Sequence, residues 1–341
     1  MIRKGAARFS LVTNAERVCT EIMRKQGVMR AIATALSLVL LTSLPCTAQE
    51  SKLSESKIRV GMIDATLTLP GDDVAKPPVA LLIAGSGSTD RDGNGPQLKP
   101  ATLKKLSEAL VTRGIATLRY DKRGAGGWKK EFGAPEDFRF KDFVDDAAAL
   151  VDYLRGSGKF SRIVVIGHSE GGLVAILTAR RVRVDRLVLL ATAARKQGDL
   201  LKAQLEKQLP PEKFAPIAKA IDAIMAGQIV DPPPAGLAIA PAMQPGMASA
   251  FTEDPIDPLR KIDIPTLIVA GGRDRQLARL DFLALTTADF AAKSLWLPDM
   301  NHVLVDVSDE ADDVASYNQP ERPLDPTLTE TVAGFVQMDG R

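Results

Sequence analysis

The segment Arg162–Gly172 constrains the fold of this chain more than any other stretch of its sequence. A run of β-branched, apolar residues ends at Gly167, Ser169 follows two residues later, and a helix-compatible segment begins after Gly171. This is a strand, a sharp turn and a helix, with the pattern G-x-S-x-G at the corner. Such a turn strains the backbone at the serine and lifts its hydroxyl clear of the strand end. The pattern therefore predicts a nucleophilic serine beside the N–H groups that begin a helix.

Strands and helices alternate on both sides of this turn. Two short strands at residues 58–63 and 65–69 are expected to form an antiparallel hairpin. Continuous apolar runs predict buried strands at 79–84, 115–120, 163–167, 186–192, 265–270 and 294–297, and amphipathic patterns predict helices at 103–113, 140–154, 280–291 and 326–338. This alternation predicts an α/β fold with a mainly parallel sheet of about eight strands and helices on both faces.

The alternation is interrupted after the sixth strand, at residues 194–264. Residues 200–209 and 212–225 have helical patterns, and the stretch 241–255 is rich in Pro and Met. We expect a helical lid inserted into the sheet domain. Its apolar residues Met243, Met247 and Phe251 fit either a substrate pocket or the lid's own core. The expected organisation is a leader at 1–48, a first core part at 49–193, the lid at 194–264 and a second core part at 265–341.

Residues 1–48 are predicted to be a signal peptide. They hold seven Lys or Arg residues and two acidic residues, Arg30 precedes an apolar stretch, and a small-residue cleavage site ends at Ala48. A start at Met29 would give a complete signal by itself. The alternative is a retained N-terminal anchor, although the apolar stretch is short for a membrane span. We therefore expect a periplasmic or secreted protein with no stable membrane span after cleavage.

The composition beyond residue 48 excludes several classes of function. With 37 basic and 40 acidic residues, this part has no excess of positive charge for binding nucleic acid. Cys19 and Cys46 are the only cysteines and both lie in the leader, which excludes disulfides, thiolate catalysis and cysteine-bound metals. The segment 90–95 imitates the start of a calcium loop, but Ala101 stands where that loop needs Glu, so we expect a turn. Neither a metal nor a cofactor is expected.

A serine hydroxyl needs a general base to take its proton, and the chain contains only two histidines. His168 is adjacent to Ser169, and neighbouring side chains on such a turn point apart, so a packing role is expected for it. His302 directly follows the last predicted strand. His302 is therefore the predicted general base.

The base in turn needs a carboxylate that fixes its tautomer and stabilises its charged form. Asp274 follows the strand predicted at 265–270, and catalytic groups gather at the carboxyl ends of parallel strands. Asp299 is the main rival, but it lies so close to His302 along the chain that a role in shaping the turn is expected. Asp306 is a weaker rival. Asp274 is therefore the predicted acid.

An oxyanion needs two backbone donors. The N–H of Glu170, the residue after the serine, should be one of them. The second should come from the Gly-Ser-Gly-Ser loop after the strand 79–84, with Ser86 the first choice and Gly87 the second. Asp121 and Arg123 are expected to hold loops in place rather than contact a substrate.

Three segments together resemble the alpha/beta hydrolase superfamily and, more narrowly, the EstD-like bacterial carboxylesterases, which are related to serine aminopeptidases. They are residues 84–94 (AGSGSTDRDGN), 119–124 (RYDKRG) and 167–171 (GHSEG). The resemblance implies Ser169 as nucleophile, Asp274 as acid and His302 as base.

These observations favour a secreted serine carboxylesterase that cleaves a small-molecule ester through an acyl-serine. A serine peptidase that acts as an aminopeptidase with the same triad is the alternative. An aminopeptidase also needs carboxylates to bind the substrate's free amine, and no such pair can be placed from the sequence. A third reading is a binding protein without catalytic activity on the same fold. The natural substrate, the acyl-chain preference and the oligomeric state are left open.

Overall fold

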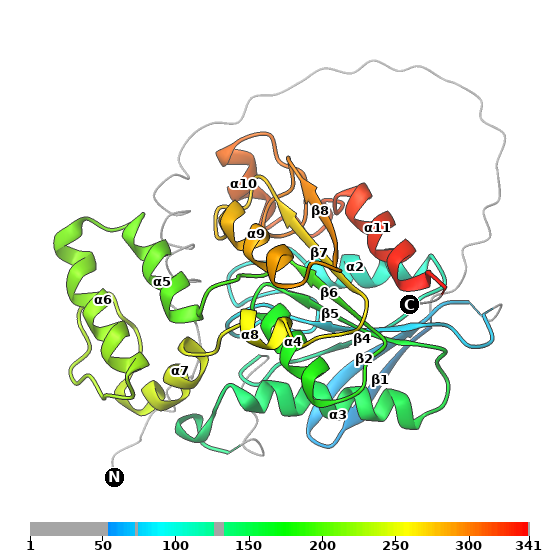
Figure 1. Cartoon of the computed structure of the whole chain (residues 1–341), viewed down its shortest axis with the longest axis horizontal. Helices are drawn as coiled ribbons and strands as arrows, with labels where there is room; N and C mark the ends of the chain where they lie inside the picture. The colour runs from blue at the N-terminus through cyan, green and yellow to red at the C-terminus, as the bar shows by residue number, and fades with distance from the viewer. Residues whose placement is uncertain (1–53, 72–73, 126–132, 340–341) are drawn as a thin grey trace, which may run out of the picture.

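The structure is a computed structural model that describes residues 54–71, 74–125 and 133–339, and an eight-stranded sheet forms its centre (Figure 1). The predicted leader, residues 1–48, lies outside the described residues. The strands are β1 (Ser54–Val60), β2 (Ile63–Leu69), β3 (Val79–Ile83), β4 (Ala116–Tyr120), β5 (Ile163–His168), β6 (Arg186–Leu190), β7 (Thr266–Gly271) and β8 (Lys293–Leu297). Their order is β1-β2-β4-β3-β5-β6-β7-β8. All neighbours from β4 to β8 are parallel, and only β1–β2 and β2–β4 are antiparallel. The predicted mainly parallel sheet is confirmed.

Helices connect the parallel strands. They are α2 (Thr102–Val111), α3 (Lys141–Gly156), α4 (Glu170–Arg181), α5 (Gln197–Glu206), α6 (Pro211–Met225), α7 (Gln244–Phe251), α8 (Ile256–Leu259), α9 (Arg279–Ala288), α10 (Glu310–Ser316) and α11 (Pro326–Gln337), with 3-10 turns η2 (Pro135–Asp137) and η3 (Pro241–Met243). Within the described ranges, no helix has the length and apolar character needed to cross a bilayer.

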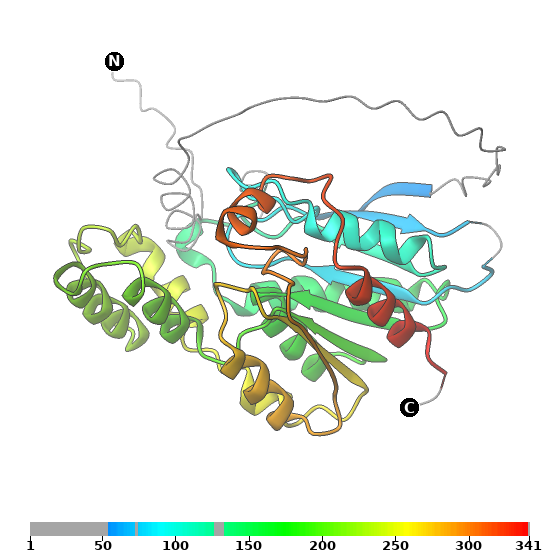
Figure 2. The ribbon, with the colours of Figure 1, turned by 90° about the horizontal axis from the view of Figure 1, so that it is seen from above.

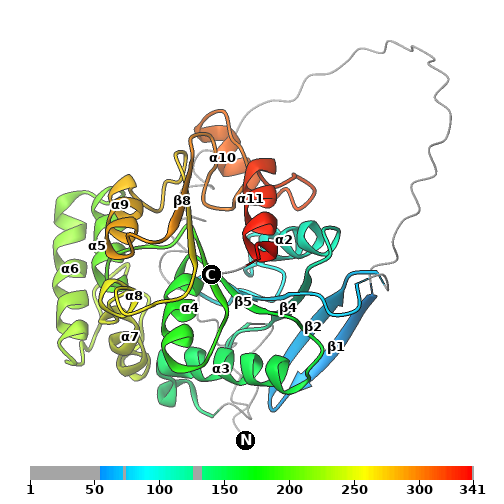
Figure 3. The same cartoon turned by 45° about the vertical axis from the view of Figure 1, so that its right-hand side comes forward.

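The central strands β3, β4, β5 and β6 are buried along their whole length because both faces of the sheet are covered there. In β3, Val79 and Leu81 point into one hydrophobic core, together with residues of α3, α4 and α9. Ala80 and Leu82 point into a second core, which α2 and α11 cover. Figure 3 shows α2 and α11 together on one side of the sheet and α3 and α4 on the other. This arrangement buries alternate residues of each central strand on opposite faces.

Between β6 and β7 the chain forms a separate group of helices, α5 to α7, which we call the helical insertion. It has its own core of apolar side chains: Leu201, Leu205, Ile217, Ala220, Ile221, Ile224, Leu237, Ile239, Met243 and Phe251. Figures 1 and 2 show the insertion beside the sheet domain, separate from the helices that cover the sheet. The insertion is thus a small helical unit next to one edge of the sheet.

Two local expectations were wrong. The first hairpin turns at Gly61 and Met62 rather than at Asp64, because Gly61 adopts the positive φ of 57° that a tight turn requires, and Val60 pairs with Ile63. The helix α10 was not predicted, because seven residues are too few for a helical period to show. It begins after Asp309, whose side chain accepts a hydrogen bond from the N–H of Asp312.

Candidate active site

Ser169 lies at the turn between β5 and α4, where its backbone is strained. Its φ of 56° and ψ of −122° fall in a region that non-glycine residues rarely adopt. A Cβ atom at Gly167 would collide with the carbonyl oxygen of Gly171, and one at Gly171 would collide with the carbonyl oxygen of Ile83. The two glycines of G-x-S-x-G therefore let the helix start directly against the sheet, with the serine at the corner.

The structure places Asp274 beside His302. Asp274 follows β7, His302 follows β8, and these strands are adjacent and parallel. Asp274 Oδ2 lies 2.7 Å from His302 Nδ1, and both side chains are buried. The other oxygen, Oδ1, accepts hydrogen bonds from the N–H groups of Gln276 (2.8 Å) and Leu277 (3.0 Å). Because a carboxylate can only accept, Nδ1 of His302 carries the proton and Nε2 is left to act as a base.

Ser169 and His302 line the same cavity. They follow β5 and β8, and the parallel strands between them bring both residues to the carboxyl edge of the sheet. In the described part of the chain, no hydrogen bond joins Ser169 Oγ to His302 Nε2. Hydrogen bonds between such groups commonly form only when a substrate is bound.

His168 supports the backbone of His302. Its Nε2 lies 2.8 Å from the carbonyl oxygen of His302, so Nε2 carries a proton and donates it. The ring is fully buried, and this burial, with His302 nearby, lowers the pKa of His168 to about 4. His168 therefore stays neutral at neutral pH and positions the loop of the other histidine.

A second buried side chain, Asn301, fixes the same loop. Asn301 Oδ1 accepts hydrogen bonds from the N–H groups of Val303 and Val305, and Nδ2 donates to Asp313 Oδ1 and Ser316 Oγ at 2.8 Å each. Sequence patterns did not identify this role, because Asp313 and Ser316 belong to the unpredicted helix α10.

The rival acids do not contact the His302 ring. Asp299 is exposed and lies 3.8 Å from Arg273. Asp306, also among the described residues, makes no hydrogen bond to the ring, and burial and the neighbouring carboxyl group of Asp325 raise its pKa to about 6.

The predicted oxyanion donors lie at the cavity beside Ser169. Ser86 and Glu170 both line it, and among the described residues neither backbone N–H has a hydrogen-bond acceptor. Gly87, the second choice, also lines the cavity. The Ser86 loop is tied back by Thr89, whose hydroxyl donates to the carbonyl oxygen of Ser86 at 2.8 Å. Two free donors of this kind could stabilise a negatively charged oxygen.

Buried ion pairs hold the loops around the site, as expected for Asp121 and Arg123. Arg91 donates to Asp121 through its backbone N–H (2.9 Å) and its guanidinium (2.6 Å). Arg123 binds both carboxylate oxygens of Asp146 at 2.7 and 2.8 Å. Asp90 closes the calcium-like segment into a turn by accepting two backbone N–H groups through Oδ1. Across the described residues, no group of three or more His, Cys, Asp and Glu is placed to hold a metal.

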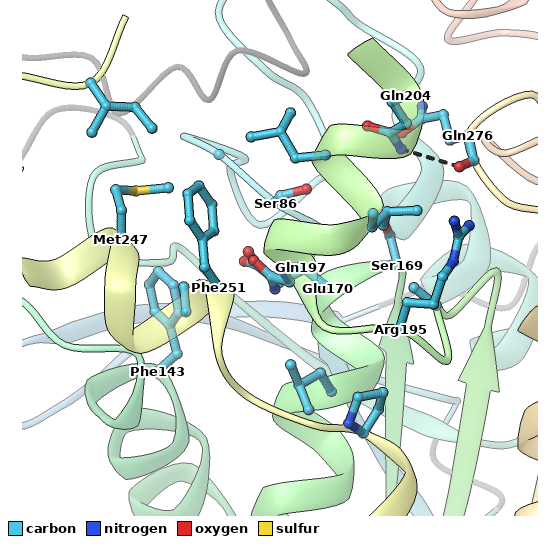
Figure 4. A pocket seen from close by; sticks show the side chains of 18 of the residues that line it. Ser86, Phe143, Ser169, Glu170, Arg195, Gln197, Gln204, Met247, Phe251 and Gln276 are labelled. Carbon is cyan, nitrogen blue, oxygen red and sulfur yellow. Dashed lines mark hydrogen bonds between the residues drawn. The ribbon is translucent and has the colours of Figure 1, made fainter. Parts of the chain in front are cut away.

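The cavity above Ser169 has a volume of about 210 Å³ and a mostly apolar wall. The insertion supplies much of this wall: Leu200, Leu201, Ile239, Met243, Met247, Ala250 and Phe251. Phe138, Phe143 and Leu173 come from the sheet domain. Figure 4 shows Phe143, Met247 and Phe251 gathered on one side of the cavity, away from Ser169. Met243 and Phe251 belong to the insertion's own core as well, so both sequence-based alternatives for them hold.

A hydrogen bond joins the insertion to the loop of Asp274. Gln204 Nε2 on α5 lies 3.1 Å from the carbonyl oxygen of Gln276, and this bond is drawn in Figure 4. Gln276 in turn donates its N–H to Asp274. Sequence patterns did not identify this contact, nor the contact of Lys122 with the carbonyl oxygen of Gly85, because both depend on how distant segments of the chain meet in the fold.

Comparisons with known proteins agree with this architecture. Esterase EstD from Thermotoga maritima is 26% identical over 267 residues, which cover 77% of this chain and 63% of that protein. The chain thus spans less than two thirds of the length of this relative. Est1E from Butyrivibrio proteoclasticus has a similar structure, with a TM-score of 0.51, 19% identity, and coverage of 82% of this chain and 96% of that one. A Pyrococcus furiosus esterase gives a TM-score of 0.53, 15% identity and coverage of 87% and 95%.

The sequence profile that describes the alpha/beta hydrolase family matches residues 80–317, from β3 to the residue that follows α10. This match includes the serine turn, the loop of Ser86, the helical insertion and the buried Asp274–His302 pair. The chain belongs to the alpha/beta hydrolase family.

Proposed function

We propose that this protein is a serine hydrolase that cleaves carboxylic esters. One observation supports the proposal most strongly: the Asp274–His302 pair and the strained Ser169 meet at one apolar cavity, beside two backbone donors without acceptors. The names of the similar proteins, esterase EstD foremost, point to the same class of reaction.

The proposed reaction proceeds in two steps. Ser169 Oγ attacks the ester carbonyl while His302 Nε2 takes its proton, and the N–H groups of Ser86 and Glu170 stabilise the oxyanion. His302 then gives the proton to the leaving alcohol, and Asp274 stabilises the charged imidazole throughout. Water hydrolyses the acyl-serine by the same steps in the second half.

Replacement of the nucleophile tests this proposal. Ser169→Ala should lower the turnover of p-nitrophenyl acetate by about 10⁴-fold or more, because no other group can form the acyl-enzyme. Ser86→Ala is the matched control. It removes a hydroxyl from the same cavity but keeps the backbone donor, so its activity should stay within a few-fold of the wild type. Substantial turnover of the ester by Ser169→Ala would contradict the proposed mechanism.

The peptidase alternative receives less support from the cavity. Among the described residues that line it, Glu170 is the only acid, and Lys122 binds its carboxylate, whereas Arg123 and Arg195 are cationic. A substrate's free amine would find no carboxylate there other than that of Glu170, which already pairs with Lys122. We therefore expect aminoacyl p-nitroanilides to be hydrolysed far more slowly than p-nitrophenyl esters. Faster cleavage of the anilides would favour the aminopeptidase. Failure of Ser169 to react with a fluorophosphonate would favour a binding protein.

We also propose that the protein is exported. The support is the pattern of residues 1–48 alone: a basic flank, an apolar stretch and a small-residue site before Gln49. N-terminal sequencing of the protein from a periplasmic or culture fraction should begin at Gln49. A full-length chain in the membrane fraction would instead favour a retained anchor.

A further inference from the structure

Lys122 lies behind the candidate oxyanion site, and no step proposed above uses it. It comes two residues after the end of β4, and its side chain is 1% exposed. Lys122 Nζ lies 2.7 Å from Glu170 Oε1 and 2.5 Å from the carbonyl oxygen of Gly85. It also lies 4.5 Å from the centre of the Phe143 ring. A carboxylate, a carbonyl and an aromatic face therefore surround the buried ammonium, which has three N–H groups to donate.

The strand order explains why one lysine can reach both partners. In the sheet, β3 lies between β4 and β5. Gly85, Lys122 and Glu170 each come two residues after the ends of β3, β4 and β5, respectively. The ammonium thus joins three adjacent strand ends at the edge of the sheet where Ser169 lies.

Both of its partners belong to the predicted oxyanion donors. The carbonyl of Gly85 and the N–H of Ser86 are part of the same planar peptide group, and they point in opposite directions. When Lys122 binds the carbonyl from behind, the N–H is held facing away from the lysine, and the peptide is polarised toward stronger donation. The carboxylate of Glu170, which is 8% exposed, anchors the residue that supplies the other N–H.

We propose that Lys122 is a positioning residue for the oxyanion site. It orients the Ser86 donor through the Gly85 carbonyl and the Glu170 donor through its carboxylate, and so fixes the spacing between the two. This inference rests on the proposed esterase function, because it needs a reaction in which an oxyanion forms. Lys122 itself does not touch the substrate.

Three variants test this role, so that the test does not depend on a single variant that could misfold. Lys122→Met removes the ammonium but leaves the Glu170 charge buried alone. The double variant Lys122→Met/Glu170→Gln removes both charges, and Glu170→Gln keeps an oxygen that can accept from Lys122. We expect kcat for p-nitrophenyl acetate to fall about 10- to 100-fold in the double variant, with KM changed less than about threefold. Glu170→Gln should lose less, about two- to tenfold.

The deciding measurement is the affinity for a trifluoromethyl ketone. Its adduct with Ser169 carries a negative oxygen in the oxyanion site, so binding should weaken in parallel with kcat. Arg119→Met is the control. Arg119 lies near the end of β4, three residues before Lys122, and its buried guanidinium forms ion pairs with the more exposed side chains of Glu55 and Asp92. Its loss should lower the urea midpoint but leave kcat and the ketone affinity within about threefold.

The possible outcomes separate this inference from the proposed function. If the folded double variant keeps wild-type kcat, or loses kcat without losing ketone affinity, Lys122 has no positioning role, although the esterase proposal stands. If Ser169→Ala remains active, the esterase proposal is wrong, regardless of the results for the Lys122 variants.

Discussion

The rim of the sheet and the helical insertion form the two sides of the cavity in different ways. We call the residues that follow the carboxyl ends of the strands, among them Ser169, Asp274 and His302, the rim of the sheet. At the rim, short hydrogen bonds between buried polar groups fix each residue, such as the 2.7 Å contact of Asp274 with His302. The insertion contributes apolar side chains, among them Met247 and Phe251, and reaches the Asp274 loop through the Gln204–Gln276 hydrogen bond. This difference predicts a division between the two sides. Changes at the rim, or in the hydrogen bond that reaches it, should affect all esters alike, whereas changes in the apolar side chains of the insertion should affect esters according to their size.

Asp274→Asn should have the largest effect among the changes that test this division. An amide at this position can donate to His302 Nδ1 and so stabilise the wrong tautomer of the base, and kcat should fall about 10³- to 10⁴-fold. The fall should be equal for p-nitrophenyl acetate and octanoate. Asp299→Asn, in the exposed rival acid, should stay within about twofold. Comparable losses in the two variants would contradict the assignment of Asp274.

His168→Gln should change how stability depends on pH. The pKa of His168 is about 4 in the folded protein and about 6.5 in an unfolded chain. Between these values the unfolded state binds more protons, so the wild type loses stability as pH falls from about 6.5 to 4. The loss should approach roughly 3 kcal/mol. Gln keeps a donor for the His302 carbonyl but does not titrate.

Urea unfolding at pH 7 and pH 4.5 measures this effect. All other titrating groups are common to both proteins, so the difference between their acid-induced losses isolates His168. We expect the variant to lose about 2–3 kcal/mol less than the wild type over this interval. Equal losses would mean that His168 is not held in its neutral form.

Met247→Trp should separate esters by size. The larger side chain fills part of the cavity of about 210 Å³ on the side away from Ser169. We expect kcat/KM for p-nitrophenyl octanoate to fall about tenfold while the value for the acetate stays within about twofold. An equal fall for both esters would show that the insertion acts on the chemistry itself and would break the comparison.

Gln204→Ala should have the smallest effect. It removes the hydrogen bond from the insertion to the Gln276 carbonyl, a single neutral contact. We expect kcat to fall two- to fivefold for both esters, because the loop that it holds also binds Asp274. Gln208→Ala, at an exposed position after the same helix, is the control and should leave kcat unchanged. A selective effect on octanoate would assign Gln204 to the wall rather than to the rim.

The sequence was most informative about features that depend on residues close together along the chain. The alternation of apolar runs predicted the sheet, because strands that are buried on both faces must be apolar throughout. Ser169 was predicted from the glycines around it, and Asp274 and His302 from their places after strands. Asp299 and Asp306 lie close to His302 along the chain, and only the structure excludes them directly, because the carboxylate that contacts His302 Nδ1, at 2.7 Å, is that of Asp274.

Contacts that depend on strand order were not predictable. Lys122 meets Gly85 and Glu170 because β3 lies between β4 and β5, and this order differs from the order along the chain. The bond from His168 to the His302 carbonyl depends in the same way on how distant strand ends meet. Periodicity and spacing carry no information on such pairings.

The close approach of Gly167 to Gly171 has a consequence for the directed evolution of this protein. Saturation libraries at either position should yield almost no folded clones, since even alanine would push its methyl group into a carbonyl oxygen. Along the cavity the insertion presents side chains, such as those of Leu200, Met247 and Phe251, rather than tightly packed glycines. New substrate ranges should therefore be sought by recombining or transplanting the segment between β6 and β7, with the turn that bears the serine left untouched.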